Sequence, residues 1–315
     1  MAHRIIFDTD PGVDDATALA FASRHPEIEI LGVTTVFGNA SIDTVTRNAL
    51  YLKRLLGLKA PVAKGAGRSV QRPNGPPPAH VHGSNGLGDV RLVDVGLPAL
   101  DPRPAHRMMS DIIRAYPGEV TLVAVGRMTN LATLLDHDPD AAALVRRVVI
   151  MGGAFGTSGT GKGNVTPYAE ANIFGDPEAA DRVFAAPWEM SAVGLDVTRQ
   201  VQLSPEDFER LSAQGGDIGR FLAEISKVYV GYHAQFGVDG CYVHDSSAVA
   251  CLLAPELFDL RSGPIRVTTE GERAGQTVQR AEPTHHHPVQ RAAVGVDADG
   301  VRRLLLETLC DSTRT

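Results

Sequence analysis

Short apolar runs alternate along the chain with longer stretches in which apolar residues recur every three or four positions. Brief apolar runs bounded by turn residues favour buried strands, whereas the longer spacing favours amphipathic helices. Their alternation predicts an α/β fold with a mostly parallel central sheet flanked by helices. In such folds ligands bind at the carboxyl ends of the strands. Strands are expected over residues 5–8, 29–36, 120–125, 148–151 and 191–195.

Helices are expected over residues 14–23, 43–56, 130–135, 177–184, 218–232, 245–253 and 297–309. Two stretches rich in Gly, Pro and His, 60–88 and 152–172, interrupt the alternation, and long loops of this kind are typical of lids and binding loops. Residues 261–293 have a strand-like pattern again, with turn residues between. Because no internal repeat or low-complexity linker divides the chain, we expect one domain over residues 1–315.

The composition excludes several classes of function. A formal charge of −7 and the lack of a Lys or Arg cluster argue against a nucleic-acid partner. No stretch approaches the roughly 18 apolar residues of a membrane span, and no signal-peptide segment precedes the first strand, so we expect a cytoplasmic protein with no membrane partner. Cys241, Cys251 and Cys310 show no CxxC spacing, and free thiols are expected.

Four carboxylates accompany the end of the first expected strand: Asp8, Asp10, Asp14 and Asp15. Acids packed this closely repel one another and resist desolvation, and a hard cation commonly neutralises such a cluster. A helix N-cap explains one acid but not four. Oxygen ligands favour calcium or magnesium over zinc, and the spacing does not fit an EF-hand. The sequence therefore predicts a metal site.

Polar residues also follow the other expected strands. Asn39 follows the second strand, and the run Gly126-Arg127-Met128-Thr129-Asn130 follows the third. The pair His244-Asp245 opens a later apolar helix, whose N-terminus favours negative charge. Asp10, Asp15 and Asp245 are therefore candidate metal ligands, and the carbonyl oxygen of Val125 and waters would complete the coordination shell. The triplet His285-His286-His287 is expected to be a solvated loop, because three adjacent residues cannot all point at one ion.

The run from Asp8 to Ala16 resembles the DTDPGxDDAxA signature of the inosine-uridine preferring nucleoside hydrolases. Further stretches match that family in order: Val36-Phe37-Gly38-Asn39, His82-Gly83-Ser84-Asn85-Gly86-Leu87-Gly88, Thr129-Asn130-Leu131-Ala132, Met151-Gly152-Gly153, Gly163-Asn164-Val165-Thr166, Glu170-Ala171-Asn172, Asp176-Pro177-Glu178-Ala179-Ala180, Leu195-Asp196-Val197-Thr198 and Val243-His244-Asp245. The resemblance extends from residue 5 to about residue 310.

The resemblance implies hydrolysis of the N-glycosidic bond of ribonucleosides to ribose and free base, with a bound Ca²⁺ ion. This cleavage develops positive charge on the ribose ring, so the site needs an activated water on one face and a way to accept the base on the other. By the same resemblance, Asp10, Asp15, Asp245 and the Val125 carbonyl are the calcium ligands. Asp10 is in addition the general base that takes the proton of the attacking water.

The remaining site residues are also carried over by resemblance. The side chains that bind the ribose hydroxyls are Asp14, Asn39, Asn164, Glu170 and Asn172. Met151 provides an apolar wall under the sugar. His244 protonates or hydrogen-bonds the departing base and His82 closes over it, a step suited to a group whose ordinary pKa lies near 6.5. Two alternatives stay open: a solvated loop position for His82, and a packing role for Tyr232 instead of one lining the base pocket. Trp188 is assigned to the core.

Two positions depart from the family pattern. Ala171 stands where the family usually has an aromatic residue, so the pocket is expected to be more open there. Arg127-Met128 replaces the more usual Pro-Leu. We expect the second change to be tolerated, because the backbone carbonyl of this turn matters more than its side chains.

Two other classes of protein remain possible on the residues alone. Asp8-Thr9-Asp10 after a strand mimics the nucleophile motif of aspartyl-phosphate-type phosphatases, although few lysines are suitably placed. The acids could instead serve a non-catalytic, calcium-dependent ribose-binding protein. The resemblance further suggests a homodimer or homotetramer acting on a small-molecule nucleoside, although no pattern in the chain shows an interface.

Overall fold

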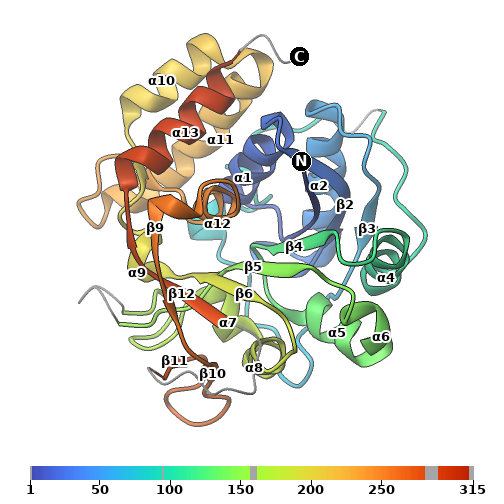
Figure 1. Cartoon of the computed structure of the whole chain (residues 1–315). Helices are drawn as coiled ribbons and strands as arrows, with labels where there is room; N and C mark the ends of the chain where they lie inside the picture. Colours follow the sequence, from blue (N-terminus) through green and yellow to red (C-terminus); the bar gives the residue numbers. More distant parts are fainter. Residues whose placement is uncertain (1, 94–95, 157–161, 281–289, 312–315) are drawn as a thin grey trace.

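An eight-stranded sheet forms the centre of the computed structural model, which describes residues 2–93, 96–156, 162–280 and 290–311 (Figure 1). The strand order is β3-β2-β1-β4-β5-β6-β12-β9. Every neighbouring pair is parallel except β12 and β9, which are antiparallel. The strands are β1 His3–Thr9, β2 Ile28–Thr35, β3 Val62–Lys64, β4 Val120–Ala124, β5 Arg147–Met151, β6 Met190–Val193, β9 Phe258–Ser262 and β12 Gln290–Val296. The predicted mostly parallel sheet is confirmed.

Alternate side chains of the central strands enter two separate cores, as the two-residue period of a strand requires. Ile5 and Phe7 of β1 belong to the core on one face of the sheet, and Ile6 belongs to the core on the other. All three are fully buried. This is why the central strands have continuous apolar runs and not an alternating pattern.

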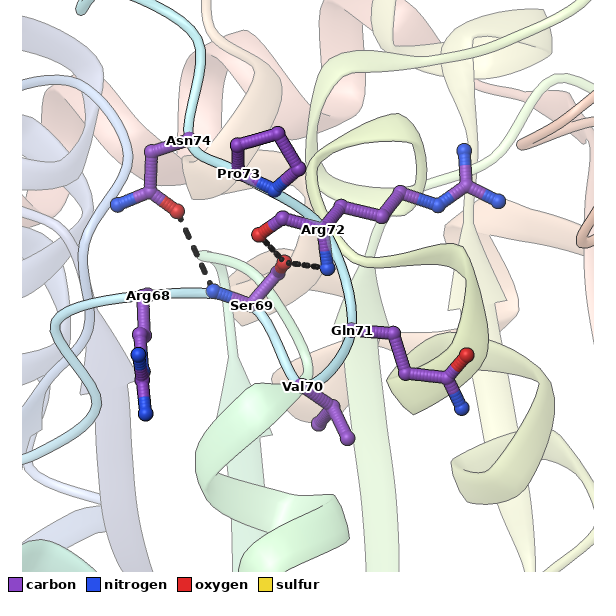
Figure 2. A pocket seen from close by; sticks show the side chains of 7 residues that line it. All are labelled: Arg68, Ser69, Val70, Gln71, Arg72, Pro73 and Asn74. Atoms are coloured by element: carbon purple, nitrogen blue, oxygen red, sulfur yellow. Dashed lines mark hydrogen bonds between the residues drawn. The ribbon is translucent and has the colours of Figure 1, made fainter.

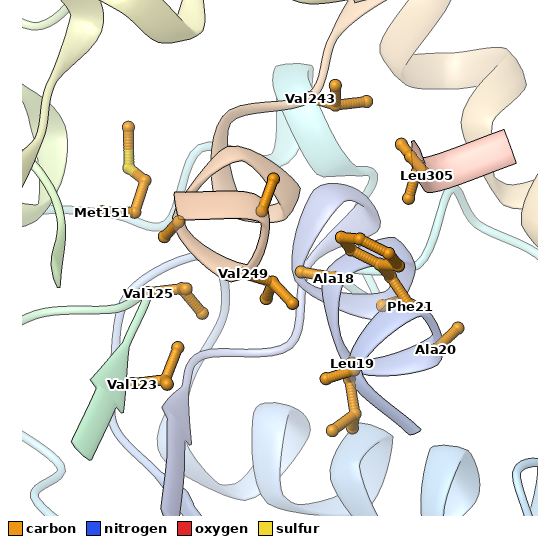
Figure 3. Packing of buried hydrophobic residues seen from close by; sticks show 14 of the residues in the cluster. Ala18, Leu19, Ala20, Phe21, Val123, Val125, Met151, Val243, Val249 and Leu305 are labelled. Atoms are coloured by element: carbon orange, nitrogen blue, oxygen red, sulfur yellow. The ribbon is translucent and has the colours of Figure 1, made fainter. Parts of the chain in front are cut away.

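Helices cover both faces. The core that holds Phe7 is closed by α1 Val13–Arg24, α2 Ile42–Leu55, α10 Pro205–Gln214, α11 Gly216–Ala234, α12 His244–Leu253 and α13 Ala298–Cys310. The core that holds Ile6 is closed by α4 Ala105–Ala115, α5 Thr129–His137, α6 Pro139–Ala142 and α8 Pro177–Phe184. Figure 3 shows Phe21 of α1 among the buried side chains of the first core, with Val249 of α12 and Leu305 of α13.

The last turn of α1 is tied to the end of the chain. Arg24 is 8% exposed, and its guanidinium donates hydrogen bonds to the carbonyl oxygens of Leu309 (2.5 Å) and Gly215 (3.3 Å). These carbonyls belong to the C-terminal helix α13 and to the junction of α10 with α11. One cation therefore holds three helices together.

The expected helices and strands are confirmed to within a few residues, but four parts of the prediction were incomplete or wrong. Helices α4 and α10 were not anticipated, because α10 has only Phe208 and Leu211 as large apolar residues and α4 follows a Pro-containing turn. The loop predicted over 60–88 contains the edge strand β3 and the short helix α3 Ala79–His82. The loop predicted over 152–172 runs into helix α7 Ala171–Gly175. The strand predicted to reach residue 195 ends at Val193, and Leu195 begins helix α9 Leu195–Thr198.

The strand-like pattern of 261–293 is confirmed by β9, β12 and the hairpin pair β10 Ile265–Val267 and β11 Thr277–Gln279. A small sheet joins β7 Gln202–Leu203 to β8 Cys241–Tyr242, and a 3₁₀ turn, η1, spans Pro255–Leu257. The His285-His286-His287 triplet lies outside the described residues. Trp188 is 1% exposed, as expected for the core, and the three cysteines are free. In the described part of the chain no helix is both long and apolar enough to cross a membrane.

Candidate active site

A cavity of about 1200 Å³ opens at the carboxyl ends of β1, β4 and β5. Its lining includes all but one of the residues predicted for the site: Asp10, Asp14, Asn39, His82, Val125, Met151, Asn164, Glu170, Asn172, Tyr232, His244 and Asp245. Asp15, the exception, is 1% exposed. The motifs that are scattered along the sequence thus converge on one place in the fold.

The turn between β1 and α1 builds the acidic part of this cavity. Asp14 and Asp15 lie in the first turn of α1, where the helix dipole favours negative charge. The Asp15 carboxylate accepts hydrogen bonds from the Thr9 hydroxyl (2.5 Å) and the Gly12 backbone N–H (3.0 Å). It also accepts one from the Asn39 side-chain amide (2.8 Å). These contacts fix Asp15 at the base of the cavity.

Three carboxylates meet closely although they come from opposite ends of the chain. Ligand oxygens of Asp14, Asp15 and Asp245 all lie within 4.8 Å of one another. Burial raises the pKa of the Asp245 carboxyl well above its ordinary value, and the nearby Asp14 and Asp15 raise it further. Burial likewise raises the pKa of Asp14, to about 6. Three buried acids in contact destabilise one another unless a cation lies among them.

This donor set fits a hard divalent cation. The Oδ1 atoms of Asp10 and Asp14 are buried and have no hydrogen-bond partner among the described residues. Carboxylate oxygens without a donor are the ligands that calcium takes in proteins. The close group contains Asp14, which the sequence had indicated as a ribose binder, and does not contain Asp10, which lines the cavity beside it.

Asp10 owes its position to two glycines. A Cβ on Gly38 would lie 1.8 Å from Asp10 Oδ2, and one on Gly126 would lie 2.6 Å from Oδ1. Its Oδ2 accepts a hydrogen bond from the Asn39 backbone N–H (2.8 Å). Burial is the main cause that raises the Asp10 pKa, followed by the charge of Asp15. Only glycine at both positions leaves room for this carboxylate.

Asp8 does not belong to the cavity lining. It is fully buried below, where its Oδ1 accepts hydrogen bonds from the Thr34 hydroxyl (2.5 Å) and the Asn130 amide (2.7 Å). Burial raises the pKa of Asp8 to about 7. These contacts join β1 to β2 and α5, so we assign Asp8 a structural role.

A second wall of the cavity is built around α7. Asn172 donates from its side chain to the carbonyl oxygens of Val125 (2.8 Å) and Met151 (3.2 Å). Glu170 caps α7 and also accepts a hydrogen bond from the Gly153 N–H (3.1 Å). Asn164 Oδ1 accepts from the Ala171 N–H (2.9 Å). The predicted ribose binders of this wall are therefore held by backbone contacts.

Histidines and aromatic rings form the opposite wall. His82 is 6% exposed and stacks on Tyr229 with 5.2 Å between ring centroids. Its Nδ1 accepts a hydrogen bond from the Val13 N–H (3.2 Å), so the open alternative of a solvated loop histidine is wrong. His244 Nδ1 lies 2.7 Å from the Thr198 hydroxyl. Burial lowers the pKa of His82 to about 4 and that of His244 to about 3, so both rings are neutral at neutral pH.

Tyr232 combines the two roles left open for it. It lines the cavity, and its ring packs edge-on against His80 (5.7 Å) and Phe236 (5.2 Å). Sequence reasoning missed Tyr229 and His233, which lie one helical turn apart on α11 and also line the cavity. The Tyr229 hydroxyl donates to Asp14 Oδ2 (3.3 Å). The four-residue spacing of these two residues was the available signal.

The turn at Arg127, where the backbone carbonyl was expected to matter more than the side chains, also presents a side chain to the cavity. Arg127 lines the cavity, with its guanidinium carbon 4.3 Å from the centre of the Phe37 ring. Ala171 lines it too, where the family usually has an aromatic side chain.

A smaller hollow of about 400 Å³ lies in the loop from Arg68 to Asn74 (Figure 2). Ser69 Oγ accepts from the Arg72 N–H (2.9 Å) and donates to the Arg72 carbonyl (2.6 Å), which closes the loop on itself. The Arg72 guanidinium forms an ion pair with Glu178 (2.8 Å). Arg72 and Pro73 also line the main cavity, so this loop forms part of its rim.

Comparisons with known proteins show what this chain is similar to. A family described as inosine-uridine preferring nucleoside hydrolase matches residues 5–303. Uridine nucleosidase 1 of Arabidopsis thaliana is 40% identical over 278 residues, which cover 88% of this chain and 81% of that protein. The non-specific ribonucleoside hydrolase RihC of Salmonella agona is 40% identical over 305 residues, which cover 96% of each. A solved structure of a purine-preferring ribonucleoside hydrolase from Gardnerella vaginalis superposes with a TM-score of 0.91 at 30% identity, over 98% of both chains.

Proposed function

The chain belongs to the inosine-uridine preferring nucleoside hydrolase family and is an N-ribohydrolase; from this premise we propose that it hydrolyses ribonucleosides with the help of a calcium ion. The observation that carries the proposal is the meeting of Asp14, Asp15 and Asp245 within 4.8 Å beside the unpartnered Oδ1 of Asp10. Asp10, Asp15, Asp245 and the Val125 carbonyl would hold the ion, and Asp14 joins them. Calcium bound there would lower the pKa of a coordinated water.

Side chains of the protein carry out the remaining steps of the proposed reaction. Asp10 accepts the proton of the attacking water as that water adds to C1′ of the ribose. Asp14 within the acidic cluster and Asn39 beside it hold the 2′- and 3′-hydroxyls. Asn164, Glu170 and Asn172 lie on the α7 wall and hold the 5′ end, with Met151 under the sugar. Each contact fixes C1′ relative to the water, which lowers the barrier through orientation.

The histidine wall accepts the base. The His244 ring is neutral, so when the Thr198 hydroxyl donates to Nδ1, the ring proton resides on Nε2. That N–H can donate a hydrogen bond to the departing base while the N-glycosidic bond breaks. His82 and Tyr232 close the base subsite. The base preference stays open, because the names of the three relatives include uridine, non-specific and purine-preferring enzymes.

The two alternative functions receive less support. An aspartyl-phosphate-type phosphatase needs a lysine near its nucleophile, and the described lining of the cavity contains arginine and histidine but no lysine. A non-catalytic ribose-binding protein has no departing base to protonate, so it does not need His82 and His244 next to the acidic cluster. We also propose, from the family resemblance, that the chain assembles as a homodimer or homotetramer, which light scattering on the purified protein tests.

The experiment is an incubation of the calcium-loaded protein with inosine, uridine, guanosine and cytidine, followed by an assay for ribose and free base. Production of both at equal rates supports the proposal. Phosphate release from an aryl phosphate without ribose release would favour the phosphatase. Tight ribonucleoside binding without turnover would favour the binding protein.

A further inference from the structure

Arg127 is a half-buried cation in the cavity wall that the proposed hydrolysis does not use. Its guanidinium lies over the Phe37 ring, and within the described residues no hydrogen bond or ion pair engages it. Burial lowers the pKa of Arg127, and the charges of Asp10, Asp176 and Glu170 offset this only in part. A partly desolvated guanidinium with free donors is suited to a bidentate oxyanion, which relieves the cost of burying the charge.

Small residues of α7 line the cavity next to Arg127. A Cβ on Gly175 would lie 2.1 Å from Arg127 Nε, so this glycine makes room for the arginine. Ala171 precedes Gly175 by four residues on α7 and therefore lies on the same helical face. Both line the cavity. The two departures from the family pattern, Arg127 and Ala171, thus lie on one wall, where one adds positive charge and the other adds space.

The proposed function would orient the ribose with its 5′ carbon at this wall. A vicinal diol chelates a hard cation, which directs the 2′- and 3′-hydroxyls to Asp14, Asp15 and Asp245. The base points to the histidine wall. The remaining substituent, on the 5′ carbon, then points to the α7 wall, where Asn164 bonds the backbone of Ala171. The cavity of about 1200 Å³ is larger than most small-molecule sites and has room for a group beyond the 5′ oxygen.

We propose that Arg127 and the space beside Ala171 form a subsite for the phosphate of ribonucleoside 5′-monophosphates, whose N-glycosidic bond the enzyme also hydrolyses. The inference rests on the proposed function and extends its substrate class. Water adds to C1′ as the bond from C1′ to the base nitrogen breaks. One water proton ends on the base, and the products are ribose 5-phosphate and free base. The phosphate ester is not cleaved.

The test compares uridine with uridine 5′-monophosphate, and inosine with inosine 5′-monophosphate, in the calcium-loaded enzyme. The expected products of the nucleotides are ribose 5-phosphate and base, identified by chromatography. Free ribose together with inorganic phosphate would mean that dephosphorylation comes first, which contradicts the subsite. A second readout is calorimetric binding of ribose 5-phosphate against ribose, with the phosphorylated sugar expected to bind at least tenfold more tightly.

Variants at Arg127 separate recognition of the phosphate from a structural role. Arg127→Gln is expected to lower the ratio of kcat/KM for the nucleotide to that for the nucleoside at least tenfold. Arg127→Lys keeps the charge but loses the bidentate geometry, so its ratio is expected to lie between those of wild type and Arg127→Gln. Arg72→Gln is the matched control, because it removes a cavity arginine already paired with Glu178 and should change the ratio less than threefold. An unchanged ratio in Arg127→Gln, with both substrates affected equally, would overturn the proposal.

Different results would refute the phosphate subsite and the proposed function. An enzyme that cleaves uridine and inosine but neither binds ribose 5-phosphate nor cleaves the nucleotides refutes the phosphate subsite alone. An enzyme that cleaves none of the four substrates refutes the proposed function.

Discussion

At the scale of single residues, the site depends on acids that would be unstable there alone. Asp10 is 2% exposed, and its Oδ1 has no donor among the described residues. Its place exists only because Gly38 and Gly126 have no side chain. Burial of this acid costs free energy, so its presence points to a role in chemistry and not in stability.

We expect Asp10→Ala to reduce turnover of inosine by at least about a thousandfold, because it removes the general base and a ligand of the proposed ion. In calcium-free buffer the free energy of unfolding should not fall, since a costly buried acid is lost. Steady-state kinetics and urea denaturation measure the two effects. Retention of more than a few per cent of the wild-type rate would exclude Asp10 as the base.

We expect His244→Ala to slow inosine and uridine about a hundredfold, but p-nitrophenyl riboside less than threefold. The nucleoside bases are poor leaving groups that need a hydrogen-bond donor, whereas p-nitrophenolate leaves without one. Comparing kcat/KM for the three substrates provides the measurement. Equal losses on all of them would show that His244 does not act on the leaving group.

The sequence predicted most of the residues that line the cavity, and the roles of their side chains stay predictions. The acids and His244 could be found because they follow strand ends or begin a helix within recognisable motifs. That the Arg127 side chain lines the cavity was not predicted, because the direction of a side chain on a turn depends on what lies opposite it, here Phe37 and Gly175. Tyr229 was missed, because a tyrosine on an amphipathic helix has the same pattern whether it packs in a core or faces a cavity.

At the scale of helices and strands, one buried acid links the C-terminal helix α13 to α10. Asp207 in the first turn of α10 is 3% exposed, and its Oδ2 accepts from the Ser204 N–H (2.9 Å). The same carboxylate accepts from the Arg302 guanidinium of α13, with 2.7 Å between Nε and Oδ2. It therefore caps one helix and pairs with another.

We expect Asp207→Ala to lower the free energy of unfolding by about 2 kcal/mol, because it leaves the Ser204 N–H and the Arg302 guanidinium without their acceptor. Glu206→Ala is the matched control on the neighbouring exposed position and should change stability by less than about 0.5 kcal/mol. Urea denaturation of both variants tests this. Equal effects of the two substitutions would mean that Asp207 contributes no more than a surface acid.

Helices and strands were predicted correctly where the apolar pattern of the sequence was strong. They were missed where contacts with other parts of the fold determine the local structure. The buried strands β1, β4 and β5 were found to within a few residues because both of their faces are apolar. The strand β3 is only three residues long and exists through pairing with Val33–Thr35 of β2. Such an edge strand has no pattern of its own that could predict it.

At the scale of the whole molecule, the acidic cluster couples folding to the metal. Carboxylates of α1 and α12 repel one another when folding brings them together. A cation bound between them therefore stabilises the native state and not the unfolded chain. We further propose that residues 1–315 form one domain, because β1, β4, β5 and β6 contribute to a single sheet with shared cores on both faces.

We expect removal of calcium with a chelator to abolish turnover and to lower the midpoint of a single unfolding transition. At free calcium of about 100 times Kd, the loss amounts to about 2.7 kcal/mol. Calorimetry with and without chelator, and after calcium is restored, measures both. Asp15→Asn should lose most of the calcium-dependent shift. A midpoint that does not depend on calcium, or two separate transitions, would contradict the coupling or the single domain.

The contacts of Arg24 mean that helix α1 connects the acids of the cavity, at its first turn, to helix α13, at its last turn. Trimming the protein back past Leu309 would remove this connection and loosen the acids far from the cut. Purification tags and fusion partners are therefore better appended after the last residue than substituted for any part of the closing helix.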